Sequence, residues 1–295
     1  MNDIELLESA LTEELPYRKT IGEDAFSFGV EIEMECVDVK NLQRFLGYRI
    51  HSWQQKEDLS LLAFNSFELS SPIFKNTHHT WNRLRKLSKA LKLFNPSFKH
   101  ASFQVSLDMV SDENLIRLFK FYALYEKVIY CFSKGNDFRL RECIKKFASP
   151  IGFSLQNELD YEETIYALKF FQNRKKYGLN INRIDEGIYK SNKVIEFRTP
   201  NGTVDAWLWQ NYINTFYHMI NYVSSSQYDI EKMNYSFKNE KFHNEVCGTL
   251  DIEKCLEFVD LIFPNDIDKL YFIKQYLQSN ESNARKYIKE RHIMK

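Results

Sequence analysis

Three glutamates alternate with apolar residues in the segment 26–36. Glu31, Glu33 and Glu35 are two positions apart, so on a β-strand they share one face at intervals of about 7 Å. Carboxylates so close together repel one another unless they face water or share a cation. The face is therefore either solvated or part of a site for Mg²⁺ or Mn²⁺, which prefer oxygen ligands. From this segment alone, a solvated edge strand is the simpler interpretation.

Three later segments show the same alternation, with apolar residues on one face and polar ones on the other. The polar residues are Glu68 in segment 65–71, Gln104 and Ser106 in segment 100–109, and Glu196 and Arg198 in segment 194–199. If these strands pair with the first one, the carboxylates, amide and guanidinium gather on one face of a sheet. Pattern alone does not distinguish a functional face from a solvated one.

Helical periodicity supplies the elements that would hold this sheet. Helices are predicted at 39–45, 78–94, 111–132, 161–175 and 204–223, with one or two helical turns at 4–11 and two or three helices after about residue 250. Further strands are predicted at 48–53 and 178–184, a polar turn at 54–60 and a basic loop at 135–150. The fold class is therefore α+β, with a largely antiparallel sheet, helices packed on one face and a helical C-terminal tail.

Composition narrows the class of protein. Lys plus Arg and Asp plus Glu both number 40, which gives no sign of a nucleic-acid or membrane partner. The 9 glycines form no phosphate-binding loop, and the five cysteines are odd in number without any C-x-x-C pair. The N-terminus has no secretory pattern, and no apolar run approaches a membrane span. We expect a soluble cytoplasmic protein with reduced thiols.

Five short motifs occur in a fixed order between about residues 26 and 225. They are Phe28-Gly29-Val30-Glu31-Ile32-Glu33; Trp53 with Asp58 and Ser60; Phe67-Glu68-Leu69-Ser70-Ser71-Pro72; Tyr177-Gly178-Leu179-Asn180; and Ile195-Glu196-Phe197-Arg198-Thr199-Pro200-Asn201-Gly202-Thr203. As an ordered set they resemble the amidoligase family of the glutamine synthetase and glutamate–cysteine ligase superfamily.

The resemblance implies ATP- and Mg²⁺-dependent joining of a carboxylate to an amine through an acyl phosphate, with Mn²⁺ as a possible substitute. The donor would be a small-molecule, peptide or protein carboxylate. The implied fold is the curved antiparallel sheet of glutamine-synthetase-type ligases. Phosphoryl transfer needs metal ions on the phosphates and cations on the developing charge. The carboxylates of the polar faces could hold such metal ions, and an arginine could supply the cation.

The family motifs carry roles over to particular residues. The implied metal ligands are Glu31, Glu33 and Glu68; the implied catalytic residues are Arg198, Glu196 and Asp58, with Ser60 beside Asp58; the implied nucleotide contacts are Gln104, Ser106, Arg139, Arg141 and Asn201. Glu196 is either a further ligand or the ion-pair partner of Arg198. The resemblance divides the chain into a lead-in (1–24), an amidoligase-like catalytic domain (25–225) and a helical C-terminal extension (226–295).

One departure from the family pattern divides two hypotheses. Family members usually carry two histidines, two positions apart, where this chain has Gln104 and Ser106; His100 lies on the same face but out of register. The first hypothesis is an active ligase. The second is a protein of the same fold that has lost turnover and binds a nucleotide, peptide or protein. Glu35 is expected at the surface or behind the metal ligands, and Cys36 in the core.

Overall fold

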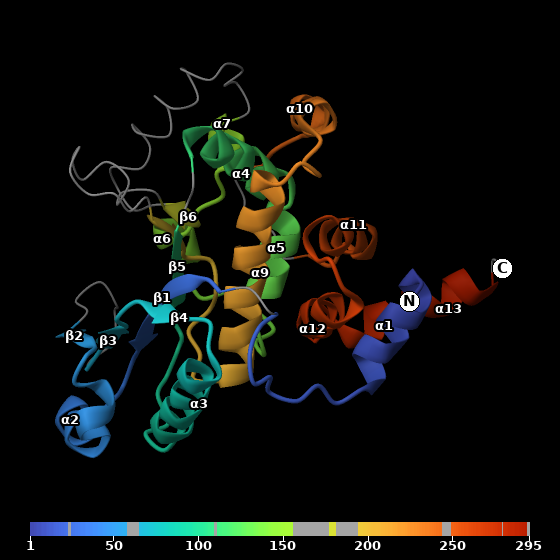
Figure 1. Ribbon diagram of the computed structural model, residues 1–295. Helices are drawn as coiled ribbons and strands as arrows, with labels where there is room; N and C mark the ends of the chain where they lie inside the picture. Colours follow the sequence, from blue (N-terminus) through green and yellow to red (C-terminus); the bar gives the residue numbers. More distant parts are fainter. Residues whose placement is uncertain are drawn as a thin grey trace.

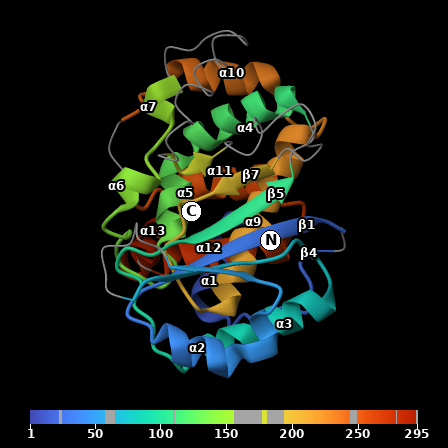
Figure 2. The ribbon, with the colours of Figure 1, turned by 90° about the vertical axis from the view of Figure 1, so that its left-hand side faces the viewer.

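The computed structural model describes residues 1–22, 25–57, 65–108, 111–155, 177–180, 194–243, 249–278 and 280–293. Within them, seven strands form one open antiparallel sheet in the order β2-β3-β1-β5-β7-β6, with β4 beside one end of β1 (Figures 1 and 2). The strands are β1 (Ser27–Met34), β2 (Gln54–Glu57), β3 (Phe67–Ser70), β4 (Phe74–Lys75), β5 (Phe103–Asp108), β6 (Leu179–Asn180) and β7 (Val194–Phe197). The predicted α+β class and antiparallel sheet are confirmed.

Helices make up most of the remaining described chain. They are α1 (Asp3–Thr12), α2 (Val39–Leu46), the 3₁₀ turn η1 (Gly47–Ile50), α3 (His78–Lys92), α4 (Asp112–Leu124), α5 (Glu126–Ser133), α6 (Ile144–Phe147), α7 (Gly152–Leu155), α9 (Ala206–Ser224), α10 (Ile230–Asn239), α11 (Ile252–Ile262), α12 (Asp266–Leu277) and α13 (Glu281–Ile293). Figure 1 shows α9 and α5 beside the sheet, α11 and α12 beyond them, and α1 with α13 farthest away, while α3 lies below the strands and α4 above them. The predicted helical C-terminal tail is confirmed.

Alternation along the strands decides which face packs on the helices. Val30 and Ile32 of β1 and Phe103 of β5 are at most 2% exposed and point to the helical side. The ring of Phe103 stacks on Trp209 of α9, with 5.6 Å between ring centroids, and Phe197 of β7 stacks on Phe216 at 4.2 Å. Burial of these large apolar surfaces is the main force that fixes the sheet on α9.

The hydrophobic core is continuous across the three predicted segments. One cluster of buried side chains extends from Leu6 of α1 through the sheet and α9 to Ile288 of α13. Lys274 of α12 also donates hydrogen bonds to backbone carbonyls at Ala10 and Glu13. The predicted segments 1–24, 25–225 and 226–295 therefore share one core.

Several predicted elements differ from the structure. Segment 48–53 is not a strand: η1 occupies residues 47–50, and β2 lies in the predicted polar turn. All four residues of β2 are exposed, so this edge strand has no apolar alternation to reveal it. The predicted helix 111–132 breaks at Tyr125 into α4 and α5, the predicted loop 135–150 contains α6, and α10 was not predicted. The predicted helix 161–175 lies outside the described residues.

Among the described helices, none combines the length and apolar character needed to cross a membrane.

Candidate functional site

Strand register brings the predicted site residues onto the face that points away from the helices. Glu33 of β1 lies opposite Glu68 of β3, Glu31 lies opposite Gln104 of β5, and Ser106 lies opposite Glu196 of β7. Directly opposed residues on antiparallel strands project to the same side. Residues separated by up to 165 positions in the chain therefore share one surface, which we call the polar sheet face (Figure 2).

A buried chain of hydrogen bonds runs across four strands of this face. Gln104 is its centre: its Nε2 donates to Glu33 Oε1 at 2.6 Å, and its Oε1 accepts from Arg198 Nη1 at 3.0 Å. Arg198 Nη1 also lies 2.6 Å from Glu196 Oε1, which accepts from Asn180 Nδ2 at 3.1 Å. The contacts with Glu33 and Arg198 hold the amide of Gln104 in one orientation, with a charged group on each side.

Arg198 is held from a second direction by the segment that carries α6. Its Nε donates to the carbonyl of Phe147 at 3.2 Å, and the residue is 9% exposed. The polar sheet face is thus covered at this end rather than open, because the α6 segment packs over it. A guanidinium in such an environment is desolvated and fixed, so its charge acts more strongly than in water.

The three predicted metal ligands share the face, but the carboxylates of Glu33 and Glu68 turn to different partners. Glu33 turns to β5, where Oε2 accepts from the backbone N–H of Ser102 at 2.7 Å. Glu68 Oε1 accepts from Lys56 Nζ at 3.1 Å and Ser70 Oγ at 2.5 Å. Among the described residues, no group of three or more His, Cys, Asp or Glu side chains could hold a metal ion as they stand. The metal role of Glu31, Glu33 and Glu68 remains a prediction.

A cavity of about 220 Å³ opens on the polar sheet face beside Glu31. Its polar lining comes from several strands and includes Glu31, Lys56, Ser70, Ser106 and Asp108. These groups are carboxylates, hydroxyls and an ammonium. The oxygen donors fit Mg²⁺ bound with phosphates, because that ion usually takes only one or two protein carboxylates and completes its shell with phosphate and water.

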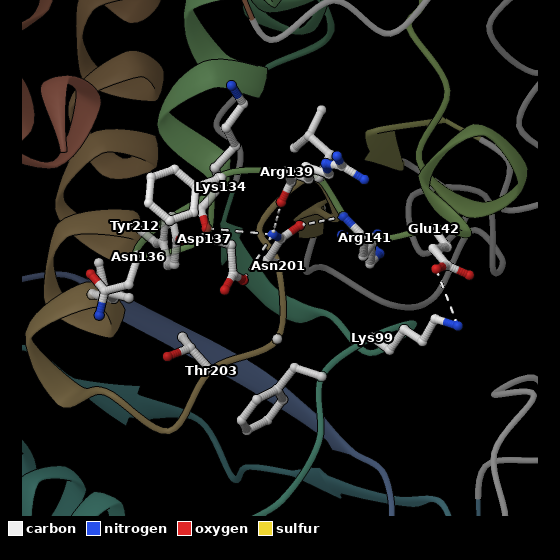
Figure 3. Close-up of a pocket in the computed structure, with 15 residues that line it drawn as sticks. Lys99, Lys134, Asn136, Asp137, Arg139, Arg141, Glu142, Asn201, Thr203 and Tyr212 are labelled. Carbon is white, nitrogen blue, oxygen red and sulfur yellow. Dashed lines mark hydrogen bonds and ion pairs between the residues drawn. The ribbon is translucent and has the colours of Figure 1, made fainter. Parts of the chain in front are cut away.

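Arg139, Arg141 and Asn201 line a different cavity, of about 590 Å³, between the 134–142 loop and the start of α9 (Figure 3). Arg141 is 5% exposed and donates to the carbonyls of Arg198, Thr199 and Pro200 at 2.7–2.9 Å. Burial lowers the pKa of Arg141, and the nearby charge of Glu33 partly offsets that effect. Arg141 thus supports the backbone that carries Arg198.

Asn201 ties the same loop to the end of β7. Its Oδ1 accepts from the backbone N–H of Arg141 at 2.9 Å, and its Nδ2 donates to the carbonyl of Arg139 at 2.8 Å and to Asp137 Oδ2 at 3.2 Å. Both ends of the amide are therefore used in holding the loop. Arg139 itself is exposed. The nucleotide roles predicted for these three residues remain predictions, and Arg141 and Asn201 already have structural ones.

Sequence reasoning missed a buried cluster next to this face. Glu35 was expected at the surface or behind the metal ligands, and it is fully buried: it accepts from the backbone N–H of His100 at 2.9 Å and lies 2.7 Å from Nδ1 of the same residue. The alternation of β1 ends at Met34, and Cys36, expected in the core, is exposed with φ of 59°. Cys143 Sγ lies 2.8 Å from the carbonyl of His100, and burial raises the pKa of its thiol. In the sequence, the one indication of a role for His100 was its position four residues before Gln104, on the same face of the predicted strand.

Asp58 and Ser60, the remaining predicted site residues, lie outside the described residues.

Comparison with known proteins adds no relative. No protein-family model matches the chain, and no curated protein matches it significantly.

Proposed function

We propose that the protein is an ATP- and Mg²⁺-dependent carboxylate–amine ligase, as its motifs imply, with the polar sheet face as its active surface. The observation that carries the proposal is the hydrogen-bonded chain from Glu33 through Gln104 to Arg198 and Glu196. Glu33 belongs to one motif of the resemblance and Arg198 and Glu196 to another, and Gln104, which stands where the family usually has histidine, joins them in one buried network. A buried network of charged and polar groups costs free energy to build, which favours a functional reason for it.

In this proposal the donor carboxylate attacks the γ-phosphorus of ATP. An oxygen–phosphorus bond forms, the bond to ADP breaks, and the amine then attacks the acyl carbon while phosphate leaves and the amine loses a proton. Arg198 is the group that would offset the negative charge on the transferring phosphoryl group, and Glu196 and Gln104 would hold its guanidinium in place. Glu31, which lines the cavity on this face, would be a protein ligand of Mg²⁺, which neutralises phosphate charge when bound.

Substitution of Arg198 by lysine tests the catalytic assignment. Arg198→Lys keeps the positive charge but loses the planar fork that contacts Gln104 and Glu196. We expect amine- and carboxylate-dependent ADP release to fall roughly 10- to 1,000-fold, the scale of losing one aligned electrostatic contact. The matched control is Arg285→Lys in α13, where the arginine is exposed and pairs with Glu281; it should retain wild-type turnover.

Melting temperature is measured on the same samples, so that loss of folded protein is not mistaken for loss of catalysis. Wild-type turnover by Arg198→Lys would remove this residue from the mechanism. Absence of ADP release from the wild-type protein with every donor and amine mixture would contradict the ligase itself.

A second function, binding without turnover, is favoured by one observation. Gln104, which stands where the family usually has histidine, uses both ends of its amide inside the network. If the polar sheet face is a binding surface for a nucleotide or peptide, the wild-type chain should bind ATP without releasing ADP. Gln104→Ala should then weaken that binding about tenfold or more, since a hydrogen bond to a charged group contributes about 1.5–3 kcal/mol.

A further inference from the structure

Residues 13–22 cross from α1 to the sheet as an extended segment, which we call the N-terminal strap. Figure 1 shows it passing beside the lower half of α9, on the side of the sheet opposite the polar sheet face. Its residues make no regular secondary structure. Among the described residues, the strap backbone from Glu14 to Gly22 makes its hydrogen bonds with side chains and not with other backbone groups.

Two amide side chains each form hydrogen bonds with both the N–H and the carbonyl of one strap residue. Gln210 of α9 accepts from the N–H of Arg18 at 3.0 Å and donates to its carbonyl at 2.8 Å. Asn76 does the same for Ile21, at 3.3 Å and 2.6 Å. A side-chain amide used in this way imitates a neighbouring strand, and it recognises an extended backbone without regard to sequence.

Two aromatic side chains extend this recognition toward α1. Trp207 Nε1 of α9 donates to the carbonyl of Leu15 at 3.0 Å, and the hydroxyl of Tyr271 of α12 donates to the carbonyl of Pro16 at 2.5 Å. Together with Gln210 and Asn76 they hydrogen-bond to the backbone of four strap residues. This is the contact pattern of a peptide in a binding groove.

Arg18 supplies the charged contact of the strap, beside the hydrogen bond from the Tyr17 hydroxyl to the Trp81 carbonyl at 2.8 Å. The Arg18 guanidinium pairs with Asp268 Oδ1 and lies 4.2 Å from the ring centroid of Tyr271. Asp268 is only 2% exposed and is held by Asn214 and Asn265, whose amides donate at 2.8 and 2.7 Å. A planar cation that both pairs with a carboxylate and stacks on an aromatic ring describes arginine better than lysine.

The arginine site is costly for the chain to fill. Arg18 Nε and Nη2 are buried without a hydrogen-bond partner among the described residues, and removing both charges of the pair from water carries a large desolvation cost. Lys19 and Thr20, by contrast, are exposed. The Arg18–Asp268 pair therefore contributes little net stabilisation, and the strap is held mainly by its backbone contacts and by Ile21, which is 1% exposed in the hydrophobic core.

We propose that α9, α12 and Asn76 form a peptide-binding groove for an extended segment that carries an arginine, and that the strap is its built-in occupant. An arginine-bearing peptide of another protein would bind by displacing the strap from Gln210, Asn76 and Asp268. The groove lies apart from the polar sheet face, so this proposal stands whether or not the protein is a ligase.

A labelled peptide with the strap sequence Glu-Glu-Leu-Pro-Tyr-Arg-Lys-Thr-Ile-Gly tests the groove by fluorescence anisotropy on the full chain. The wild-type chain should bind it weakly, because its own strap occupies the groove and reduces the available fraction. Arg18→Ala should bind it about tenfold or more tightly than the wild type does. The matched control, Lys19→Ala, removes an exposed neighbouring charge and should behave as the wild type does.

Two further variants test the arginine site. Adding Asp268→Asn to the Arg18→Ala chain should abolish the gain, and a peptide with alanine in place of its arginine should not bind. Equal binding of the two peptides, or binding that is unchanged by Asp268→Asn, would overturn the proposal. If Arg18→Ala fails to fold, hydrogen exchange of the wild-type chain tests whether the strap is released. The Arg18 and Ile21 amides should exchange at least about tenfold faster than those of central α9. Equal rates would overturn release of the strap.

Discussion

Two buried arginine–carboxylate pairs lie on opposite sides of the sheet. Arg198 pairs with Glu196 on the polar sheet face, and Arg18 pairs with Asp268 beneath the N-terminal strap; the side chains are 11% and 3% exposed in the first pair and 13% and 3% in the second. The first pair joins residues two positions apart, while the second closes a loop of 250 residues. Similar burial therefore serves two different geometries.

The two guanidinium groups also differ in how many hydrogen-bond acceptors surround them. Arg198 has further acceptors in Gln104 and the Phe147 carbonyl, so its orientation is fixed by its immediate neighbours. Arg18 has buried N–H groups without partners in the described structure. A guanidinium that is fully held by its scaffold suits charge stabilisation in a reaction. One that depends on a single distant carboxylate suits a contact that can be made and broken.

Removing the carboxylate from each pair should give the largest difference in stability between the two pairs. Among the described residues, Asp268→Ala leaves the Arg18 guanidinium with the Tyr271 ring as its one partner, and we expect the free energy of unfolding to fall by about 3–5 kcal/mol, as for a broken buried pair. Glu196→Ala leaves Arg198 with Gln104 and Phe147, so a smaller loss of about 1.5–3 kcal/mol is expected. Urea unfolding monitored by tryptophan fluorescence measures both.

The control for this experiment is Asp266→Ala, because Asp266 is also on α12 but is 42% exposed in its ion pair with the N-terminus. It should leave the free energy of unfolding almost unchanged, because an exposed ion pair contributes little. Equal losses in Asp268→Ala and Glu196→Ala would show that neighbouring acceptors do not support Arg198, and the distinction between the two pairs would fail.

The pH dependence of stability should distinguish a paired carboxylate from an unpaired one. Burial acts to raise the pKa of Asp268, but the charge and hydrogen bond of Arg18 outweigh it and the net pKa is lowered. Burial raises the pKa of Glu126 from 4.5 to about 8, partly offset by the N–H groups of Ile151 and Gly152. The stabilisation from Asp268 is thus present above pH 3.8 and lost as the pH falls through its lowered pKa.

Glu126 should show the opposite sign. Its folded form binds a proton more tightly than its unfolded form, so its contribution is complete below pH 4.5 and is lost as the pH rises through about 8. We expect the free energy of unfolding to decrease between these values by an amount on the order of a few kcal/mol. Glu126→Gln should flatten this alkaline slope and Asp268→Asn the acid one; an unchanged slope in either variant would contradict the assigned titration.

Most of the sheet was predictable because its strands alternate. The segments around Glu31, Glu68, Gln104 and Glu196 became β1, β3, β5 and β7, and their register places the polar residues on one face. Local periodicity determines which face is buried, and that information is present in any short window of sequence. β2 has no apolar alternation, and so the same reasoning failed there.

The partners of each polar side chain were not predictable, because they depend on contacts between distant segments. Nothing local shows that Glu35 is buried against His100, or that Arg141 supports the carbonyls of residues 198–200. Arg18 shows the limit most clearly. It stands in a polar lead-in with no periodicity, and its partner Asp268 lies near the other end of the chain.

The smallest expected effect concerns Lys56, and it sharpens the question of what Glu68 does. Lys56 is 53% exposed and its ion pair with Glu68 is at the surface, so Lys56→Ala should change the free energy of unfolding by about 1 kcal/mol or less. If Glu68 is a metal ligand, it must leave Lys56 to bind an ion. The Lys56→Ala variant should then bind Mn²⁺ more tightly, by up to about fivefold, since the lost pair no longer competes.

Titration followed by electron paramagnetic resonance measures free Mn²⁺. Glu68→Gln, which keeps the shape of the side chain, should weaken Mn²⁺ binding. Unchanged Mn²⁺ affinity in both variants would leave Glu68 as the partner of Lys56 and Ser70 only, and any metal site on the polar sheet face would have to be built without it.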